Sequence, residues 1–148
     1  MREATGKNDG RMVSQYLQST GLREGNPWCA AVIVWTFQEA SKLCGVAMTF
    51  IRSALANGIY NWAMNTGRKA KQQQVQEGDL IVWKFSRSAS GHIGRVRRKI
   101  NNLWVINDEG NTASGTGNQR DGDGFYQRKR YLGQLGRMAL RGYIGRAV

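Results

Sequence analysis

The apolar residues in the first part of the chain recur at helical spacing. Between residues 9 and 20 they fall at positions i, i+3 and i+4, which predicts an amphipathic helix. Asn8 or Asp9 is suited to cap the start of this helix, and Gly21 is suited to end it. The chain is therefore expected to begin with a helix that buries one face.

A second helix is predicted from about Cys29 to Leu43, with Gly45 just past its end as a C-terminal stop. Residues 30–37 are almost entirely apolar, so we expect this helix to be buried on most sides. Short helical turns are expected over residues 50–65, with Trp62 as their anchor.

After Gly78 the pattern changes to short segments rich in β-branched and aromatic residues, separated by Ser/Gly or Asn-Asn turns. These segments predict strands at residues 80–85, 92–100, 103–108, 125–132 and 138–145. In the second of them, Val96 and Ile100 share one face while the basic residues share the other, which predicts a half-buried strand with a basic outer surface. Helices followed by antiparallel strands predict an α+β fold, and we expect a single domain spanning residues 1–148.

The charge of the chain is unevenly distributed. Of a net charge of +12, residues 1–83 contribute +3 (9 basic and 6 acidic) and residues 84–148 contribute +9 (13 basic and 4 acidic). Such an excess predicts an anionic partner, which leaves nucleic acid, a membrane surface or a cell-wall polymer open. No segment approaches the ~20 apolar residues of a membrane span. The N-terminus lacks the apolar stretch of a signal peptide, so we expect synthesis in the cytoplasm.

Two cysteines allow one disulfide, but the predicted helix separates them. At about 1.5 Å per residue, the helix places the Cα atoms of Cys29 and Cys44 about 22 Å apart, whereas a disulfide needs roughly 4.4–6.8 Å. Cys44 fits the role of a small core hydrophobe. Cys29 stands at the N-terminus of the helix, where the dipole favours a thiolate, so both a packing role and a nucleophilic role stay open for it.

His92 is the single histidine, so it is the one imidazole that could serve a cysteine nucleophile. It opens a predicted strand, although a lone histidine is also common as an ordinary surface or core residue. If the strands at 92–100 and 103–108 form a hairpin, the start of the first lies beside the end of the second. Glu109 or Asn111 would then stand next to His92 and could orient it, although the same residues also suit a turn.

Four segments carry a resemblance in this order: NPWCAAVIVW, EGDLIVW, SGHIGRV and INDEGNT. Together they resemble the CHAP family (cysteine, histidine-dependent amidohydrolases/peptidases), and ATGKNDG and RGYIGR extend the resemblance over nearly the whole chain. The resemblance implies a papain-like fold, with N-terminal helices packed on an antiparallel sheet. It also implies Cys29 as nucleophile, His92 as general base and Glu109 as the orienting group, with Asn111 completing the site.

The backbone N–H of Cys29 would be the oxyanion donor. Some members of the family hold calcium in an acidic loop before the cysteine. The corresponding segment here, GLREGNPWC, has one acidic residue, so we expect no metal and no cofactor.

The resemblance further implies a peptidoglycan hydrolase, either an N-acetylmuramoyl-L-alanine amidase or a peptide endopeptidase, acting in the periplasm or cell wall. A phage endolysin or a secreted antibacterial effector fits a small basic domain, with a holin, a secretion system or an immunity protein as partner, and we expect a monomer. Trp28 and Trp62 are candidates to line a substrate groove, whereas Trp83 fits the core. The basic C-terminal half is expected to hold the anionic envelope through Arg128, Lys129, Arg130, Arg137, Arg141 and Arg146.

Two alternatives from other classes stay open. A net charge of +12 with five Trp and five Tyr also suits a nucleic-acid-binding module, although no nucleic-acid-binding motif is present and we expect no specific nucleic acid. A catalytically inactive relative kept for wall binding is the other, but it would have no need of both Cys29 and His92.

Overall fold

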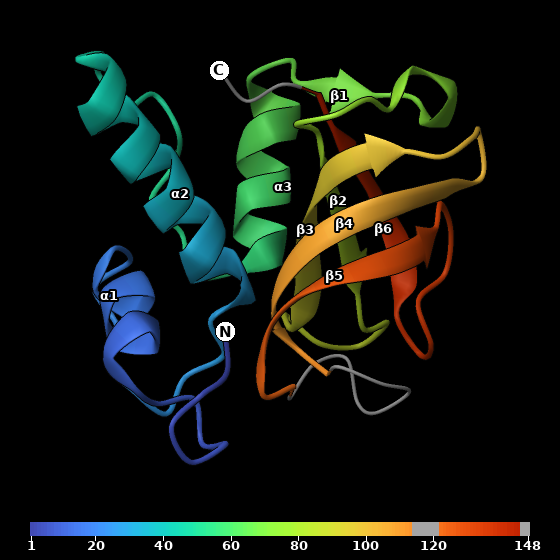
Figure 1. The fold of residues 1–148 in the computed structure, drawn as a ribbon. Coiled ribbons are helices and arrows are strands. Elements are labelled where there is room, and N and C mark those ends of the chain that lie inside the picture. Colours follow the sequence, from blue (N-terminus) through green and yellow to red (C-terminus); the bar gives the residue numbers. More distant parts are fainter. Residues whose placement is uncertain (114–121, 146–148) are drawn as a thin grey trace.

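A computed structural model describes residues 1–113 and 122–145 of the chain (Figure 1). These residues form three α-helices, one short 3-10 turn and six strands. The helices are α1 (Arg11–Gln18), α2 (Cys29–Cys44) and α3 (Ala56–Asn65), and the turn is η1 (Gln72–Gln74). The strands are β1 (Lys69–Ala70), β2 (Leu80–Lys84), β3 (Gly91–Lys99), β4 (Trp104–Thr112), β5 (Gly124–Tyr131) and β6 (Ala139–Ile144).

The six strands form one antiparallel sheet in the order β1-β6-β2-β3-β4-β5. Helices α2 and α3 lie against this sheet, and α1 packs on α2 at the side away from it (Figure 1). The predicted α+β fold is thereby confirmed. No helix within the described ranges is long and apolar enough to cross a membrane.

The first helix is shorter than predicted, and its predicted cap is wrong. Gly10 occupies the N-cap position, and no side chain caps the helix. Asp9 is engaged elsewhere, because its carboxylate accepts hydrogen bonds from the Thr5 backbone N–H at 2.9 Å and the Thr5 hydroxyl at 2.6 Å. The Asp9 carboxylate therefore bonds to Thr5 in a local turn and does not cap α1.

The second helix agrees with its predicted bounds, and Gly45 ends it in the left-handed region with φ of 64°. Burial, however, is confined to its first six residues, Cys29–Val34. Beyond them α2 projects past the sheet (Figure 1), so its last turns find no second layer to pack against. Cys44 is exposed for this reason, and the expectation that it is a small core hydrophobe is wrong.

The strand containing His92 is half-buried with a basic outer surface, but its apolar face ends earlier than predicted. Val96 is fully buried, whereas Ile100 is 41% exposed. The pairing of β3 with β4 shifts between Val96 and Arg98, and this irregularity breaks the alternation that would have carried Ile100 to the same face.

Apolar residues fill both faces of the sheet. One cluster joins α2 and α3 to β2 and β3, and a second lies on the opposite face around Trp83, Val96 and Val105. Trp83 is fully buried and its Nε1 donates to the Gly133 carbonyl at 2.7 Å, which confirms its predicted core position. A third cluster packs α1 on the start of α2. The start of α2 is therefore held from two sides.

Candidate active site

Cys29 is the first residue of α2, and the residue before it fixes its position. Trp28 is fully buried, its ring stacks on Tyr16 with centroids 5.5 Å apart, and its Nε1 donates to the Glu3 carboxylate at 2.7 Å. The chain therefore enters α2 at a point anchored by two distant segments. Cys29 itself is a free thiol, 6% exposed.

The partial positive charge at the N-terminus of α2 is not neutralised by a neighbouring side chain of the helix. No side chain caps the helix, and its first turn contains no acidic residue. The N–H groups of the first turn therefore keep their partial positive charge available to an anion. A thiolate on Cys29, or an oxyanion formed beside it, is stabilised by such a helix start.

His92 and Glu109 form a buried pair, as the hairpin argument predicted. β3 pairs antiparallel with β4, and the Nε2 atom of His92 lies 2.8 Å from Oε2 of Glu109. Both side chains are 0% exposed. The remaining ring nitrogen, Nδ1, has no partner of hydrogen-bonding geometry among the described residues, which leaves it as the nitrogen available to the thiol.

The electrostatics of the pair favour its charged form. Burial by itself lowers the pKa of His92, but the charge of Glu109 and the interaction with the Cys29 side chain outweigh it and raise that pKa to about 9. Burial works against the carboxylate in the same way. Hydrogen bonds from Arg130 and the charge of His92 nevertheless lower the pKa of Glu109 to about 2. At neutral pH the two groups are an imidazolium and a carboxylate.

Arg130 on β5 completes this chain of contacts. Its Nε donates to Oε1 of Glu109 at 2.7 Å and its Nη2 donates to Oε2 at 2.6 Å. Arg130 is 6% exposed, so the expectation that it holds the anionic envelope is wrong. The sequence does contain a signal: Arg130 lies two residues before Leu132, so the period of a strand directs both side chains to the same, inner face.

Two other motifs that carried the resemblance have structural roles here. Gly110 lets β4 approach α2, because a Cβ at that position would lie 2.6 Å from both Trp28 and Val32 side-chain atoms. Asp79, at the entry to β2, accepts a hydrogen bond from the Gln76 backbone N–H at 2.9 Å and is 1% exposed. These residues shape the framework around the thiol.

Asn111 lies near the end of β4, two residues beyond Glu109. It is fully buried, and its backbone has φ of 53°, in the left-handed region that asparagine tolerates better than most residues. Of the two residues predicted to orient the histidine, Glu109 is the one that contacts His92 Nε2. A role for Asn111 in completing the site stays a prediction.

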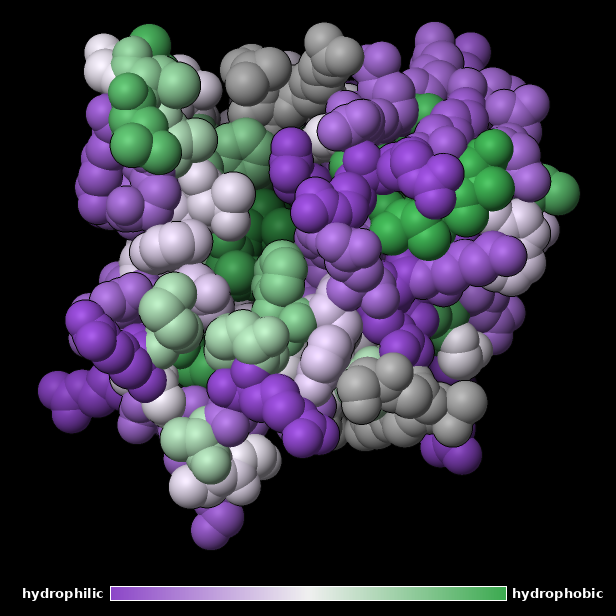
Figure 2. Space-filling view, viewed as in Figure 1, coloured by the Kyte–Doolittle hydropathy of each residue, from purple (hydrophilic) through white to green (hydrophobic). Residues whose placement is uncertain are grey.

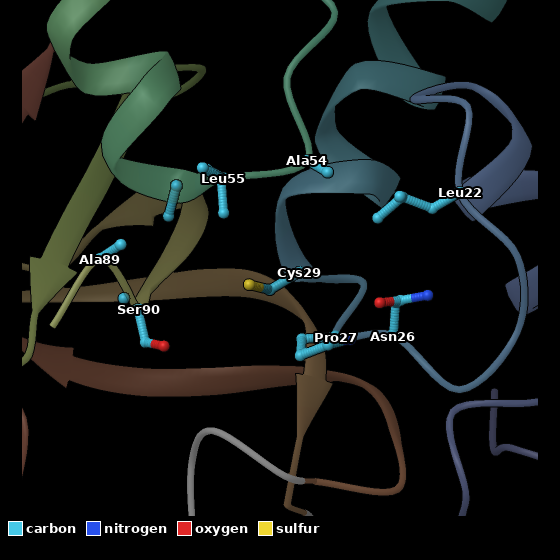
Figure 3. Close-up of a pocket in the computed structure, with 10 residues that line it drawn as sticks. Leu22, Asn26, Pro27, Cys29, Ala54, Leu55, Ala89 and Ser90 are labelled. Atoms are coloured by element: carbon cyan, nitrogen blue, oxygen red, sulfur yellow. The ribbon is translucent and has the colours of Figure 1, made fainter.

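A small cavity of about 130 Å³ opens at Cys29 (Figure 3). The Cys29 side chain lies between Leu22 and Asn26 on one side and Ala89 and Ser90 on the other. The described lining is apolar apart from two side chains. It comprises Leu22, Asn26, Pro27, Cys29, Ala54, Leu55, Ala56, Ala89, Ser90 and Gly91. Figure 2 shows hydrophobic side chains in a hollow between the helices and the sheet, with mostly hydrophilic side chains over the sheet itself.

Neither tryptophan expected in the substrate groove lines this cavity. Trp28 is fully buried against Tyr16, so its side chain is not available to a substrate. Trp62 on α3 is half-buried, packs edge-on against Phe50 with centroids 5.0 Å apart, and carries the Arg68 guanidinium 4.8 Å above its ring. Large aromatic residues contribute most when buried, so Trp28 serves packing, whereas a substrate-binding role for Trp62 stays a prediction.

The acidic residue in the segment before Cys29 accepts hydrogen bonds from other parts of the protein. Glu24 accepts hydrogen bonds from the Gly10 N–H, at 2.9 Å, and from the Ser14 hydroxyl. Among residues 1–113 and 122–145, no group of three or more His, Cys, Asp or Glu side chains is arranged to hold a metal ion.

The fold and the site define a class: an α+β domain with a free cysteine at a helix start and a buried His–Glu pair, the arrangement that cysteine hydrolases use. Comparison with protein families shows which family of this class the chain belongs to. The model of the CHAP domain matches residues 21–111, more than half of the 148 residues, and the chain belongs to this family of amidase- and peptidase-type hydrolases. No curated protein and no solved structure matches the chain significantly.

Proposed function

We propose that the protein is a peptidoglycan hydrolase that cleaves an amide bond of the cell wall through the Cys29 thiolate. The observation that carries the proposal is the position of Cys29. Its free thiol stands at an uncapped helix start, in an open cavity, and its side chain interacts with His92 of the buried His92–Glu109 pair. Membership of the CHAP domain family supports the same chemistry.

The proposed reaction has two steps. The Cys29 thiolate attacks the amide carbonyl, and the oxyanion of the tetrahedral intermediate is stabilised by the first-turn N–H groups of α2. As the intermediate collapses, the C–N bond breaks and His92 gives its proton to the leaving amine, which leaves a thioester on Cys29. Neutral His92 then takes a proton from water, the resulting hydroxide attacks the thioester, and the carboxylic acid leaves as the thiolate is regenerated.

The proposed partner is the anionic bacterial envelope, which the exposed basic residues would hold. Of the residues expected in this role, Lys129, Arg137 and Arg141 are exposed, whereas Arg146 lies outside the described residues. Two further exposed residues, Arg97 and Arg98 on β3, line a groove of about 650 Å³ on the outer face of the sheet. A monomeric phage endolysin, or an injected effector with its immunity protein, would use such a surface in the periplasm or cell wall.

The proposal is tested on purified sacculi. We expect the protein to lower their turbidity, and the Cys29→Ala and His92→Ala variants to leave it unchanged. Cys44→Ala is the matched control, because it removes the other thiol without touching the cavity. Clearing by Cys29→Ala at the rate of the unmodified protein would refute the proposal. Mass spectrometry of the released muropeptides identifies the bond, since the new amine belongs either to L-alanine or to a cross-linking residue.

A further inference from the structure

Arg130 and Glu109 form a deeply buried ion pair. Their side chains are 7% and 0% exposed, and two N–H groups of the guanidinium meet the two oxygens of the carboxylate. Burying such a pair costs desolvation free energy, and apolar side chains of similar volume often stabilise a core as well or better. The buried pair therefore points to a role beyond stability.

The geometry of the carboxylate supplies that role. Oε1 of Glu109 accepts from Arg130 Nε, with Asn107 Nδ2 a further donor at 3.3 Å. Oε2 accepts from Arg130 Nη2 at 2.6 Å and lies 2.8 Å from His92 Nε2. Because the guanidinium is a rigid planar fork, the two-point contact leaves the carboxylate little freedom to rotate away from the imidazole.

We propose that Arg130 is a positioning residue of the active site, which locks Glu109 in place and keeps it ionised so that Glu109 can orient His92. Arg130 does not line the cavity at Cys29, and it reaches His92 through its hydrogen bonds to Glu109. It stands on β5, beyond residues 21–111 matched by the family model, and extends the Cys29–His92–Glu109 site by a strand outside that match. This inference rests on the proposed function, because the effect of Arg130 is read through hydrolysis.

The charge of Arg130 matters as much as its shape. Hydrogen bonds from Arg130 are the largest influence that lowers the pKa of Glu109 against the effect of burial. Without them, burial would favour a protonated Glu109, and a neutral carboxylic acid stabilises an imidazolium less well than a carboxylate does.

The test compares Arg130→Gln and Arg130→Lys with Lys42→Gln, which removes a basic charge at an exposed position on α2 that does not line the cavity. The kcat and KM are measured on a soluble muropeptide across pH, with rates normalised to the folded fraction from circular dichroism. For Arg130→Gln we expect kcat to fall on the order of 10- to 100-fold with little change in KM, the size typical of losing a group that orients a first-shell ligand. The acid limb of the pH profile should move to higher pH, and Lys42→Gln should change neither kcat nor the pH profile.

Arg130→Lys keeps the charge but loses the planar fork, so its kcat should lie between the two. If Arg130→Gln does not fold, Arg130→Lys decides, and a kcat and pH profile equal to those of the unmodified protein overturn the proposal. A folded Arg130→Gln variant that has only a lower melting temperature, with unchanged kcat, also overturns it. Failure of the proposed function gives a different result, because Cys29→Ala would then retain full activity.

Discussion

Gly94 on β3 lies directly against Glu109 on β4. A Cβ built on Gly94 would stand 2.8 Å from Cγ of Glu109 and 2.9 Å from Nδ2 of Asn107. The glycine is needed there for space. The close approach lets the buried carboxylate reach His92 across the hairpin, so the glycine two residues after the histidine in SGHIGRV is part of the site's construction.

Gly94→Ala is accordingly predicted to impair hydrolysis. Contacts under 3.0 Å cannot persist, so the side chain of Glu109 or its surroundings must shift, which we expect to disturb its contact with His92 Nε2. We expect kcat to fall about tenfold or more, since small displacements of an orienting group are costly. Gly145→Ala is the control, because a Cβ there meets its nearest neighbour, Ala70, at an ordinary 3.6 Å. Equal activity of both variants in the turbidity assay would contradict the prediction.

The stability of the protein should depend on pH through the His92–Glu109 pair. The pKa of His92 is raised from its ordinary 6.5 to about 9, so its stabilising contribution is complete below pH 6.5 and is lost as pH rises through 9. The pKa of Glu109 is lowered from 4.5 to about 2, so its contribution is complete above pH 4.5 and is lost as pH falls toward 2. The pair thus contributes most between about pH 4.5 and 6.5.

Melting temperatures recorded by calorimetry from pH 4 to pH 10 test this dependence. We expect the Tm of the unmodified protein to fall between pH 7 and pH 9, and His92→Gln to remove much of that fall. A His92→Gln variant whose Tm declines over this range as steeply as that of the unmodified protein would show that the decline has another source.

Trp28 should matter for stability, because its side chain is buried and bonded to Glu3. Trp28→Phe keeps a ring against Tyr16 but removes the Nε1 donor, and the loss of a hydrogen bond to a charged acceptor is expected to cost about 1.5–3 kcal/mol of unfolding free energy. KM for a muropeptide should not change. The exposed Trp104 provides the control, and Trp104→Phe should leave the free energy of unfolding nearly unchanged. A raised KM in Trp28→Phe at unchanged stability would restore a substrate-binding role.

The two thiols should differ in accessibility and in the effect that labelling them has on activity. Cys44 is exposed at the end of α2, whereas Cys29 is 6% exposed and lines the cavity. A bulky maleimide should therefore label Cys44 first without loss of activity, and iodoacetamide should then abolish activity through Cys29. Cys44→Ala should change the free energy of unfolding by less than about 0.5 kcal/mol, as surface substitutions usually do. Inactivation by labelling of Cys44 alone would be inconsistent with these positions.

Local patterns in the sequence predicted the parts of the structure that depend on neighbouring residues. The helix from Cys29 follows from its apolar run and Gly45, and the contact between His92 and Glu109 follows from antiparallel pairing of consecutive strands. The burial of Trp28 depends on Glu3, 25 residues away, and the partner of Glu109 is Arg130 on the next strand. Such contacts are set by how separate elements pack, and charge alone suggested that Arg130 was exposed.

Glu109→Gln tests two roles of the carboxylate, its contribution to stability and its effect on His92 in catalysis. The amide keeps the shape of the side chain but loses the charge that balances His92 and pairs with Arg130. Breaking a buried pair in this way is expected to cost about 3–5 kcal/mol of unfolding free energy. Because Glu109 also raises the pKa of His92, the alkaline limb of the kcat profile should move to lower pH while kcat falls.

The double variant Glu109→Gln/Arg130→Met also removes the buried charge that Glu109 balanced and should regain much of the lost stability, because an apolar side chain of similar length then fills the site. It should regain no activity, since His92 still lacks its orienting carboxylate. Chemical denaturation and muropeptide hydrolysis measured on the two single variants and the double variant form one cycle. Recovery of activity together with stability in the double variant would mean that Glu109 serves the fold alone.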